Sequence, residues 1–346
     1  MCNLYDDIKR IFENQQLWDY YIDKRQDEIE FPLTNKDEAL HFINYYFHTG
    51  GKEVVFDTHK IFSGDSEIIN DRSMHIVSTF FIGIIISDLF PDIKKEKLFL
   101  YRWFLTCLFH DYGYIIENNK EKYPPKIYNM SKIRKELSIT KRFPYQKYDR
   151  DTINKYFKYI KKSRLRLDHG IIGGLLLYDR LVKNFEANFK KAKKVKTDIS
   201  EMGFEYLGLQ WSKNDFKLYA QSADSIVAHN IWLANKEKDK TSYREFGGID
   251  KLIINNHTDK LSMNDAFILL LAIADTIEPI KFFSQHKEKC ILQKIKISIS
   301  ENKIKIKILD ECINYTNWFE KINDLKNWMN VSVYLESNEI TISIID

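Results

Sequence analysis

Ionisable side chains interrupt strongly apolar segments, and this pattern constrains the fold more than any other feature of the sequence. Asp275 lies inside the apolar run Leu269–Ile277, and His75 lies in the mostly apolar segment Met74–Phe81. An ionised carboxylate that is buried without a partner costs many kcal/mol, so buried charges are paired or bind metal ions. The chain must therefore fold so that these polar groups meet partners inside the core.

Most of the chain is predicted to be helical. Asn35–Glu38 has the pattern of a capping box, which would start a helix over Ala39–Phe47, and Gly50-Gly51 would end it. Apolar residues recur with helical spacing in the longer segments. We expect further helices near residues 66–90, 97–110, 169–190, 214–234 and 262–283.

The pattern changes after about Gln285, where apolar residues begin to alternate with polar ones. Glu301-Asn302 and Ser337-Asn338 each divide one alternating region into two segments, which predicts two β-hairpins with one buried face each. The four strand segments are 295–299, 304–308, 331–335 and 340–344.

Between the hairpins, apolar residues from Trp318 to Met329 recur at helical spacing. The predicted fold class is therefore mainly α, with a small C-terminal α+β unit of ββαββ type. We expect a helical domain over residues 1–285 and the ββαββ unit over residues 286–346.

The sequence favours a cytoplasmic protein without a membrane partner. Residues 1–12 are polar and charged, so no secretory signal is expected. The apolar stretches are shorter than the ~20 residues needed to cross a bilayer. The four cysteines lack the paired spacing of a disulfide framework or zinc knuckle, which fits a reducing compartment.

Six potential metal ligands lie in the apolar helical segments. An imidazole or a carboxylate in such a place needs a reason, and six groups exceed what one tetrahedral ion can use. They suit two ions joined by one bridging carboxylate. The six are His75, His110, Asp111, His169, His229 and Asp275.

Each of these residues also has an ordinary interpretation. The alternative for Asp275 is a buried salt bridge to Arg102 or Arg166, and His257 is a rival for the role of His229. Asp168 is either the N-cap of the helix that begins at His169 or a partner of a neighbouring histidine. The remaining histidines are expected to be structural, namely His41, His48, His59 and His286.

The order His, His-Asp, His, His, Asp resembles the HD-domain superfamily, and in particular its members with two metals. Leu108–Gly113 resembles the family's defining motif, and Ala274–Pro279 resembles the segment around its last aspartate. The resemblance spans residues 72–279, about 60% of the chain. It implies a helical HD domain and a metal-dependent phosphohydrolase.

The resemblance also implies a role for each ligand. One metal would be held by His75, His110 and Asp275, the other by His169 and His229, and Asp111 would bridge them. A hydroxide between the ions would be the nucleophile, so His110 and Asp111 are also the catalytic residues. Imidazole and carboxylate ligands favour two divalent transition-metal ions, Fe, Mn, Co, Ni or Zn, over Ca.

The sequence departs from the family at a position that matters for the substrate. Many HD phosphohydrolases have a lysine that contacts the substrate's phosphate where this chain has Tyr114, so another cation would have to replace it. The residues expected to bind the substrate are Arg72, Tyr114, Lys162 and Arg166. Gly170, Gly173 and Gly174 would let a backbone or a substrate approach the helix after His169.

A basic segment, residues 117–166, separates the His-Asp motif from His169. It has sixteen Lys or Arg against five Asp or Glu, a net charge of +11, whereas the whole chain carries +4 and the remainder therefore −7. Aromatic residues are interleaved with these cations, a pattern typical of surfaces that bind nucleotides or single-stranded nucleic acid. The alternative is an ordinary solvated helical face.

We therefore expect a hydrolase that cleaves a phosphoester or phosphoanhydride bond of a nucleotide or related phosphorylated compound. One alternative is a di-iron oxygenase of the HD-domain type. Another is a module that binds nucleic acid or a nucleotide and carries a vestigial metal site. The sequence leaves open the substrate, the metal, the oligomeric state and the role of the ββαββ unit.

Overall fold

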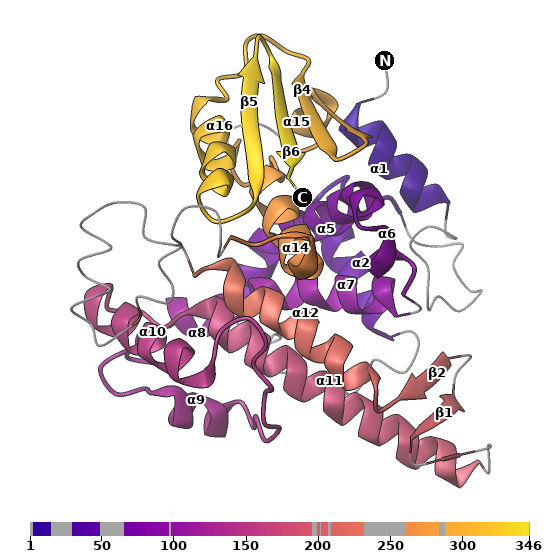
Figure 1. Cartoon of the computed structure of the whole chain (residues 1–346), viewed down its shortest axis with the longest axis vertical. Helices are drawn as coiled ribbons and strands as arrows, with labels where there is room; N and C mark the ends of the chain where they lie inside the picture. Colours follow the sequence, from indigo (N-terminus) through magenta and orange to yellow (C-terminus); the bar gives the residue numbers. More distant parts are fainter. Residues whose placement is uncertain are drawn as a thin grey trace.

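The architecture is that of a computed structural model of the whole chain, and it is mainly helical (Figure 1). The structure describes residues 3–14, 30–48, 66–96, 98–195, 199–200, 202–206, 209–231, 249, 260–283 and 288–345.

Five helices pack against one another to form the centre of the molecule. They are α5 (Ser66–Ile86), α7 (Phe99–His110), α11 (His169–Lys194), α12 (Asp215–His229) and α14 (Ala266–Ile277). Helix α11 lies along α12, and both contact α7, while α14 contacts α5 and α12 (Figure 1). Each of the five was predicted from the spacing of its apolar residues.

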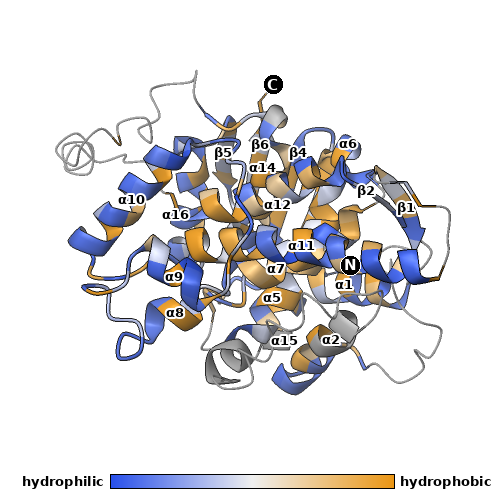
Figure 2. Cartoon of the chain, turned by 90° about the horizontal axis from the view of Figure 1, so that it is seen from below, coloured by the Kyte–Doolittle hydropathy of each residue, from blue (hydrophilic) through white to orange (hydrophobic). Residues whose placement is uncertain are grey.

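Helix α5 is apolar around most of its circumference, which is typical of a helix buried on all sides. Within the described residues, one 18-residue window, Arg72–Leu89, is long and apolar enough to cross a membrane, but 83% of it is buried inside the protein. Figure 2 shows hydrophobic residues along the central helices, whereas many residues of the outer helix α10 (Arg150–Ser163) are hydrophilic.

The remaining helices and strands surround this centre. The helices are α1 (Leu4–Glu13), α2 (Lys36–His48), α6 (Pro91–Lys94), α8 (Tyr114–Asn118), α9 (Met130–Glu136), α15 (Glu288–Gln293) and α16 (Thr316–Asn323). The strands are β1 (Gly203–Tyr206), β2 (Leu209–Ser212), β3 (Ile295–Ser300), β4 (Lys303–Ile308), β5 (Val331–Glu336) and β6 (Glu339–Ile344). The short β1–β2 hairpin was not predicted from the sequence.

Several predicted helix boundaries differ from the structure. Asn35 does cap α2, since its side chain accepts a hydrogen bond from the Glu38 N–H at 2.9 Å. Helix α12, however, ends at His229 and not near residue 234, because the N–H of Asn230 turns back to the carbonyl of Ala228. Helix α14 is shorter than predicted as well and ends at Ile277, two residues before Pro279.

The ββαββ unit has the predicted elements in the predicted order. Both hairpins turn where expected, and the sheet order is β3-β4-β6-β5, all antiparallel. Alternate isoleucines of β4 and β6 are buried, as the alternation required. The division into domains at residue 285 stays a prediction, because contacts cross it.

Contacts near both ends of α14 attach the ββαββ unit to the helical centre. Backbone hydrogen bonds join Leu261, just before α14, to Trp328 and Asn330 at 3.0 and 2.8 Å. The ring of Phe283, just after α14, lies edge-on to Trp318 of α16, with centroids 5.5 Å apart. The unit is thus anchored at both ends of α14, and it lies above that helix in Figure 1.

The basic segment folds against α11 and α12. Buried Asp179 of α11 accepts hydrogen bonds from the N–H groups of Thr140 and Lys141, and Asp224 of α12 accepts one from Lys147 N–H at 2.8 Å. Most of its aromatic side chains face inward and are buried, namely Tyr123, Phe143, Tyr156, Phe157 and Tyr159. They are packed in the core, so the idea that they form a base-stacking surface loses its support.

Close approach between helices depends on glycines in the first turns of α11. A Cβ on Gly173 would lie 2.3 Å from the carbonyl oxygen of Phe109 on α7. The sequence left open whether a backbone or a substrate needs this space, and at Gly173 the structure shows a backbone.

This close approach predicts an inverted effect of a Gly→Ala substitution. Alanine in a helix interior normally stabilises by roughly 0.5–1 kcal/mol relative to glycine. Gly173→Ala should instead destabilise by about 1–3 kcal/mol, because the added methyl group would overlap α7. Chemical denaturation measures the change, and a more stable variant would contradict the packing.

Candidate metal centre

The five central helices each bring one part of the predicted ligand set to a common point. His75 lies in the middle of α5, and His110 with Asp111 ends α7. His169 begins α11, and His229 ends α12. Asp275 lies in the last turn of α14. Residues up to 200 positions apart in the chain thus meet in the core.

One half of the centre has four donor atoms that face the same point. They are the Nε2 atoms of His75 and His110, Oδ1 of Asp275 and Oδ2 of Asp111. The Nε2 atoms of His75 and His110 are 3.3 Å apart. Asp275 Oδ1 lies 3.2 Å from His75 Nε2 and 3.6 Å from His110 Nε2. Ligands about 2.1 Å from one ion lie roughly 3.0–3.4 Å from one another. These distances fit a metal ion between the donors.

Asp111 connects this half to the other. Its Oδ2 lies 3.5 Å from His75 Nε2 and 3.6 Å from His110 Nε2. Its Oδ1 instead faces His169 Nε2 at 3.8 Å. Donor atoms of Asp111, His169 and His229 form a second group within 4.8 Å of one another. One carboxylate therefore serves two groups that can each hold a metal ion.

All four histidines are held by their outward nitrogen, Nδ1. His75 Nδ1 donates to Glu278 Oε2 at 2.8 Å, and His169 Nδ1 donates to Glu117 Oε2 at 2.8 Å. Such hydrogen bonds fix the tautomer and leave the Nε2 lone pair for a metal. The imidazole nitrogens and carboxylate oxygens that converge here are atoms that can ligate a cation.

The other two histidines use the ends of their own helices. The Nδ1 of His110 donates to the carbonyl of Cys107, and that of His229 donates to the carbonyl of Ile226 at 2.6 Å. In both helices the N–H group of the residue after the histidine bonds to the carbonyl of the residue before it. The N–H of Asp111 bonds to Phe109, and the N–H of Asn230 bonds to Ala228. The carbonyl three residues before each histidine is thereby left for the imidazole, as carbonyls at helix ends commonly are.

Glu117 and Glu278 are functional residues that the sequence analysis missed. Both are buried, at 5% and 0% exposure, and both lie in segments already singled out. Glu278 follows Asp275 by three residues, and Glu117 follows Asp111 by six. Two acids in apolar surroundings beside a ligand motif were the available signal.

Asn230 was also missed. Its side-chain amide donates to His169 Nε2 at 2.6 Å and so lies beside the second group of ligands.

Cations lie beside both carboxylates of the centre. Asp275 pairs with Lys281 at 2.7 Å, whereas Arg102 pairs with Glu96 and Arg166 with Glu117, so neither predicted alternative partner contacts it. The Asp275 side chain is 22% exposed, so it is less buried than the sequence suggested.

Arg72 pairs with Asp111, the other carboxylate of the centre. The guanidinium carbon also lies 3.9 Å from the ring centroid of Tyr114, and that ring stacks on His169 at 3.5 Å. The Arg72 side chain is 36% exposed, and that of Lys281 is 30% exposed. Each of these partly exposed cations contacts one carboxylate of the centre.

The other predicted substrate contacts lie elsewhere. Arg166 donates to Glu117 at 2.8 Å and so acts on His169 through that carboxylate. Lys162 is exposed on α10. Asp168 caps α11 by accepting from Ile171 N–H at 2.8 Å, which is the simpler of its two interpretations.

Of the remaining histidines, His41 is the one whose side chain lies within the described residues. His41 is exposed on α2, and the side chain of His48 is outside the described residues. His59, His257 and His286 lie outside the described residues too.

Burial and neighbouring charge act differently on the histidines. Burial would lower the pKa of His75, but hydrogen bonds with Asp275 and Glu278 outweigh it and raise the pKa to about 9. Burial, with His169 and His110 nearby, lowers the pKa of His229 to about 3. The pKa of Asp111 is held far below its usual range, because His110, His75 and Arg72 outweigh the effect of burial.

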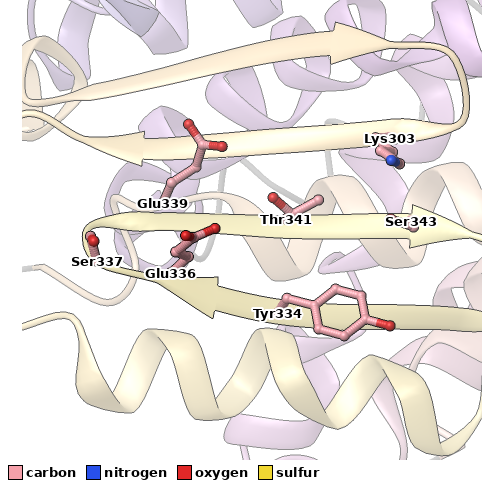
Figure 3. A pocket seen from close by; sticks show the side chains of 7 residues that line it. All are labelled: Lys303, Tyr334, Glu336, Ser337, Glu339, Thr341 and Ser343. Atoms are coloured by element: carbon pink, nitrogen blue, oxygen red, sulfur yellow. The ribbon is translucent and has the colours of Figure 1, made fainter.

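A pocket of about 430 Å³ on the open face of the C-terminal sheet contains none of these residues (Figure 3). It is lined by Lys303, Tyr334, Glu336, Ser337, Glu339, Thr341 and Ser343.

Comparison with protein-family models, with curated proteins and with solved structures finds no match to this chain. The site is therefore assigned from its own geometry.

The position of Asp111 predicts how metal content depends on the two carboxylates. Asp111→Ala should lose both ions, since one oxygen faces each group, whereas Asp275→Ala should weaken mainly one. Metal analysis of protein purified without chelators measures both. Asp88→Ala is the control, because Asp88 is exposed and pairs with Lys94. A full metal load in Asp111→Ala would contradict the bridging geometry.

The raised pKa of His75 predicts that metal uptake releases protons. With a pKa of about 9 the imidazole is protonated at pH 7, and it must lose that proton to ligate a metal. Affinity should therefore fall by up to about tenfold per pH unit as the pH drops below 9. Calorimetry in buffers of different ionisation enthalpy counts the protons. Release of none at pH 7 would contradict the assignment.

Proposed function

We propose that this chain is a divergent HD-domain protein and a metal-dependent phosphohydrolase. The observation that carries the proposal is the placement of Asp111, whose two oxygens face two separate groups of histidines. A carboxylate between two metal sites is characteristic of centres that cleave phosphate esters with paired ions. The order of the ligands along the chain adds support.

The nitrogen and oxygen donors fit two divalent transition-metal ions. His75, His110, Asp111 and Asp275 would hold one, and Asp111, His169 and His229 the other. Bound there, the ions would supply Lewis acidity and a hydroxide nucleophile at neutral pH. The first ion would have four protein ligands and the second, held by Asp111, His169 and His229, would have three. The second ion would therefore have more room for a substrate ligand.

The chain's own residues would bind and orient the substrate. The Arg72 guanidinium can bind a phosphate in bidentate fashion. The guanidinium lies over the Tyr114 ring, which would hold it in position. Lys281 would replace the cation that the family places at Tyr114. Glu117 and Glu278 keep His169 and His75 in the tautomer that presents Nε2.

The basic segment is proposed to attract anionic substrates and not to stack their bases. Its net charge of +11 produces a field that raises the local concentration of a phosphorylated ligand. A nucleotide remains the proposed substrate class, and nucleic acid remains an alternative partner through these cations alone.

The test combines a substrate panel with a trace of dissolved oxygen. A hydrolase should release phosphate from nucleotides or related compounds in the presence of added Mn²⁺, Fe²⁺, Co²⁺, Ni²⁺ or Zn²⁺, without consuming oxygen. Oxygen uptake with the iron form would favour the di-iron oxygenase. A full metal load with neither reaction would favour the binding module.

Arg72 gives a variant with a defined expectation. Arg72→Met should raise the KM for a phosphorylated substrate by about ten- to a hundredfold, the effect of losing one bidentate charged contact worth roughly 1.5–3 kcal/mol. Metal content should stay unchanged, since a guanidinium does not ligate cations. Steady-state kinetics beside metal analysis measures both. An unchanged KM would remove Arg72 from the substrate site.

A further inference from the structure

The side chain of Asn230 lies against the nitrogen of His169 that belongs to the second group of ligands. Its carboxamide is 2.6 Å from His169 Nε2. His169 Nδ1 donates to Glu117, so Nε2 carries the lone pair that a metal would use. Asn230 therefore lies beside the atom through which His169 would hold the second ion.

The main chain of Asn230 is held from two sides. Its N–H bonds to the carbonyl of Ala228 at the end of α12, and its carbonyl accepts a hydrogen bond from the Tyr156 hydroxyl of α10 at 3.0 Å. Tyr156 is buried, at 2% exposure. Because these bonds fix the start of a short side chain, the carboxamide stays close to His169.

A cation at His169 Nε2 changes which end of the carboxamide is favoured there. The N–H group can donate to the nitrogen while the lone pair is free. Beside a metal ion the same N–H would point its positive end at a positive charge, whereas a half-turn about the last side-chain bond brings the oxygen to that place. Adjacent ligands of one ion are roughly 3 Å apart, so a small shift from the observed contact lets the oxygen share the ion with His169.

We propose that Oδ1 of Asn230 is a further ligand of the second metal ion, beside Asp111, His169 and His229. The inference rests on the proposed function and adds a neutral donor to the ion that has fewer carboxylates. A carboxamide holds a cation more weakly than a carboxylate does, because it carries no net charge. A phosphate oxygen of the substrate can therefore displace it.

Chelator competition on the full-length protein loaded with Co²⁺ tests this without catalysis. Metal analysis measures the cobalt that stays bound as the chelator concentration rises, and His229→Ala identifies the step that belongs to the second ion. Asn230→Ala should weaken the binding of mainly that ion, by about tenfold. Asn230→Asp should strengthen it by about tenfold or more, because a charged oxygen replaces a neutral one in the same place.

The aspartate variant separates a ligand from a residue that only orients His169. An ionised aspartate cannot donate to Nε2, so a purely orienting role predicts weaker metal binding in both Asn230 variants. Asn14→Asp is the matched control, because Asn14 is likewise the C-cap of a helix, α1, and is exposed. The same added charge at that position should leave both cobalt ions bound as in the wild type.

Failure of Asn230→Asp to bind the second cobalt ion more tightly, or equal tightening in Asn14→Asp, would overturn the inference while leaving the proposed function in place. If the variants behave as expected but no compound is hydrolysed, the proposed function fails and the ligand stands. A wild type that binds no second cobalt ion would overturn both.

Discussion

The architecture depends on one constraint, which is that the single carboxylate of Asp111 faces two groups of histidines. Its oxygens point in different directions, so His75 and His110 must approach from one side and His169 and His229 from the other. That requires four helices to converge within a few ångströms, and Asp275 adds a fifth. Glycines at the start of α11 make the approach possible, because any side chain there would meet the backbone of α7 or α12.

Much of the fold and of the ligand set could be predicted from the sequence. The apolar periodicity located the central helices, and the alternation of Ile, Val or Leu with polar residues located each strand of the C-terminal sheet. The ligand residues could be selected because a polar group in an apolar helix is costly, and the structure brings all six together. Their assignment to individual metal ions stays a prediction.

The contacts that the sequence did not reveal depend on which residues are neighbours in the fold. A local sequence pattern does not show this. Lys281 was overlooked because nothing in a local pattern shows which cation will pair with Asp275. Arg166 was expected to contact the substrate but forms an ion pair with Glu117, because the basic segment folds back over the start of α11. The aromatic residues of that segment suggested a stacking surface, yet a folded segment of this size needs a core of its own.

The helix ends at His110 and His229 make helix length a chemical variable. In each case the carbonyl that holds the imidazole is available only because the backbone stops following the helix at the next residue. One more helical turn would return that carbonyl to the backbone and release the ring to its other tautomer, with the proton on Nε2. A shift in the residue at which either helix ends would therefore change which nitrogen of the imidazole is basic.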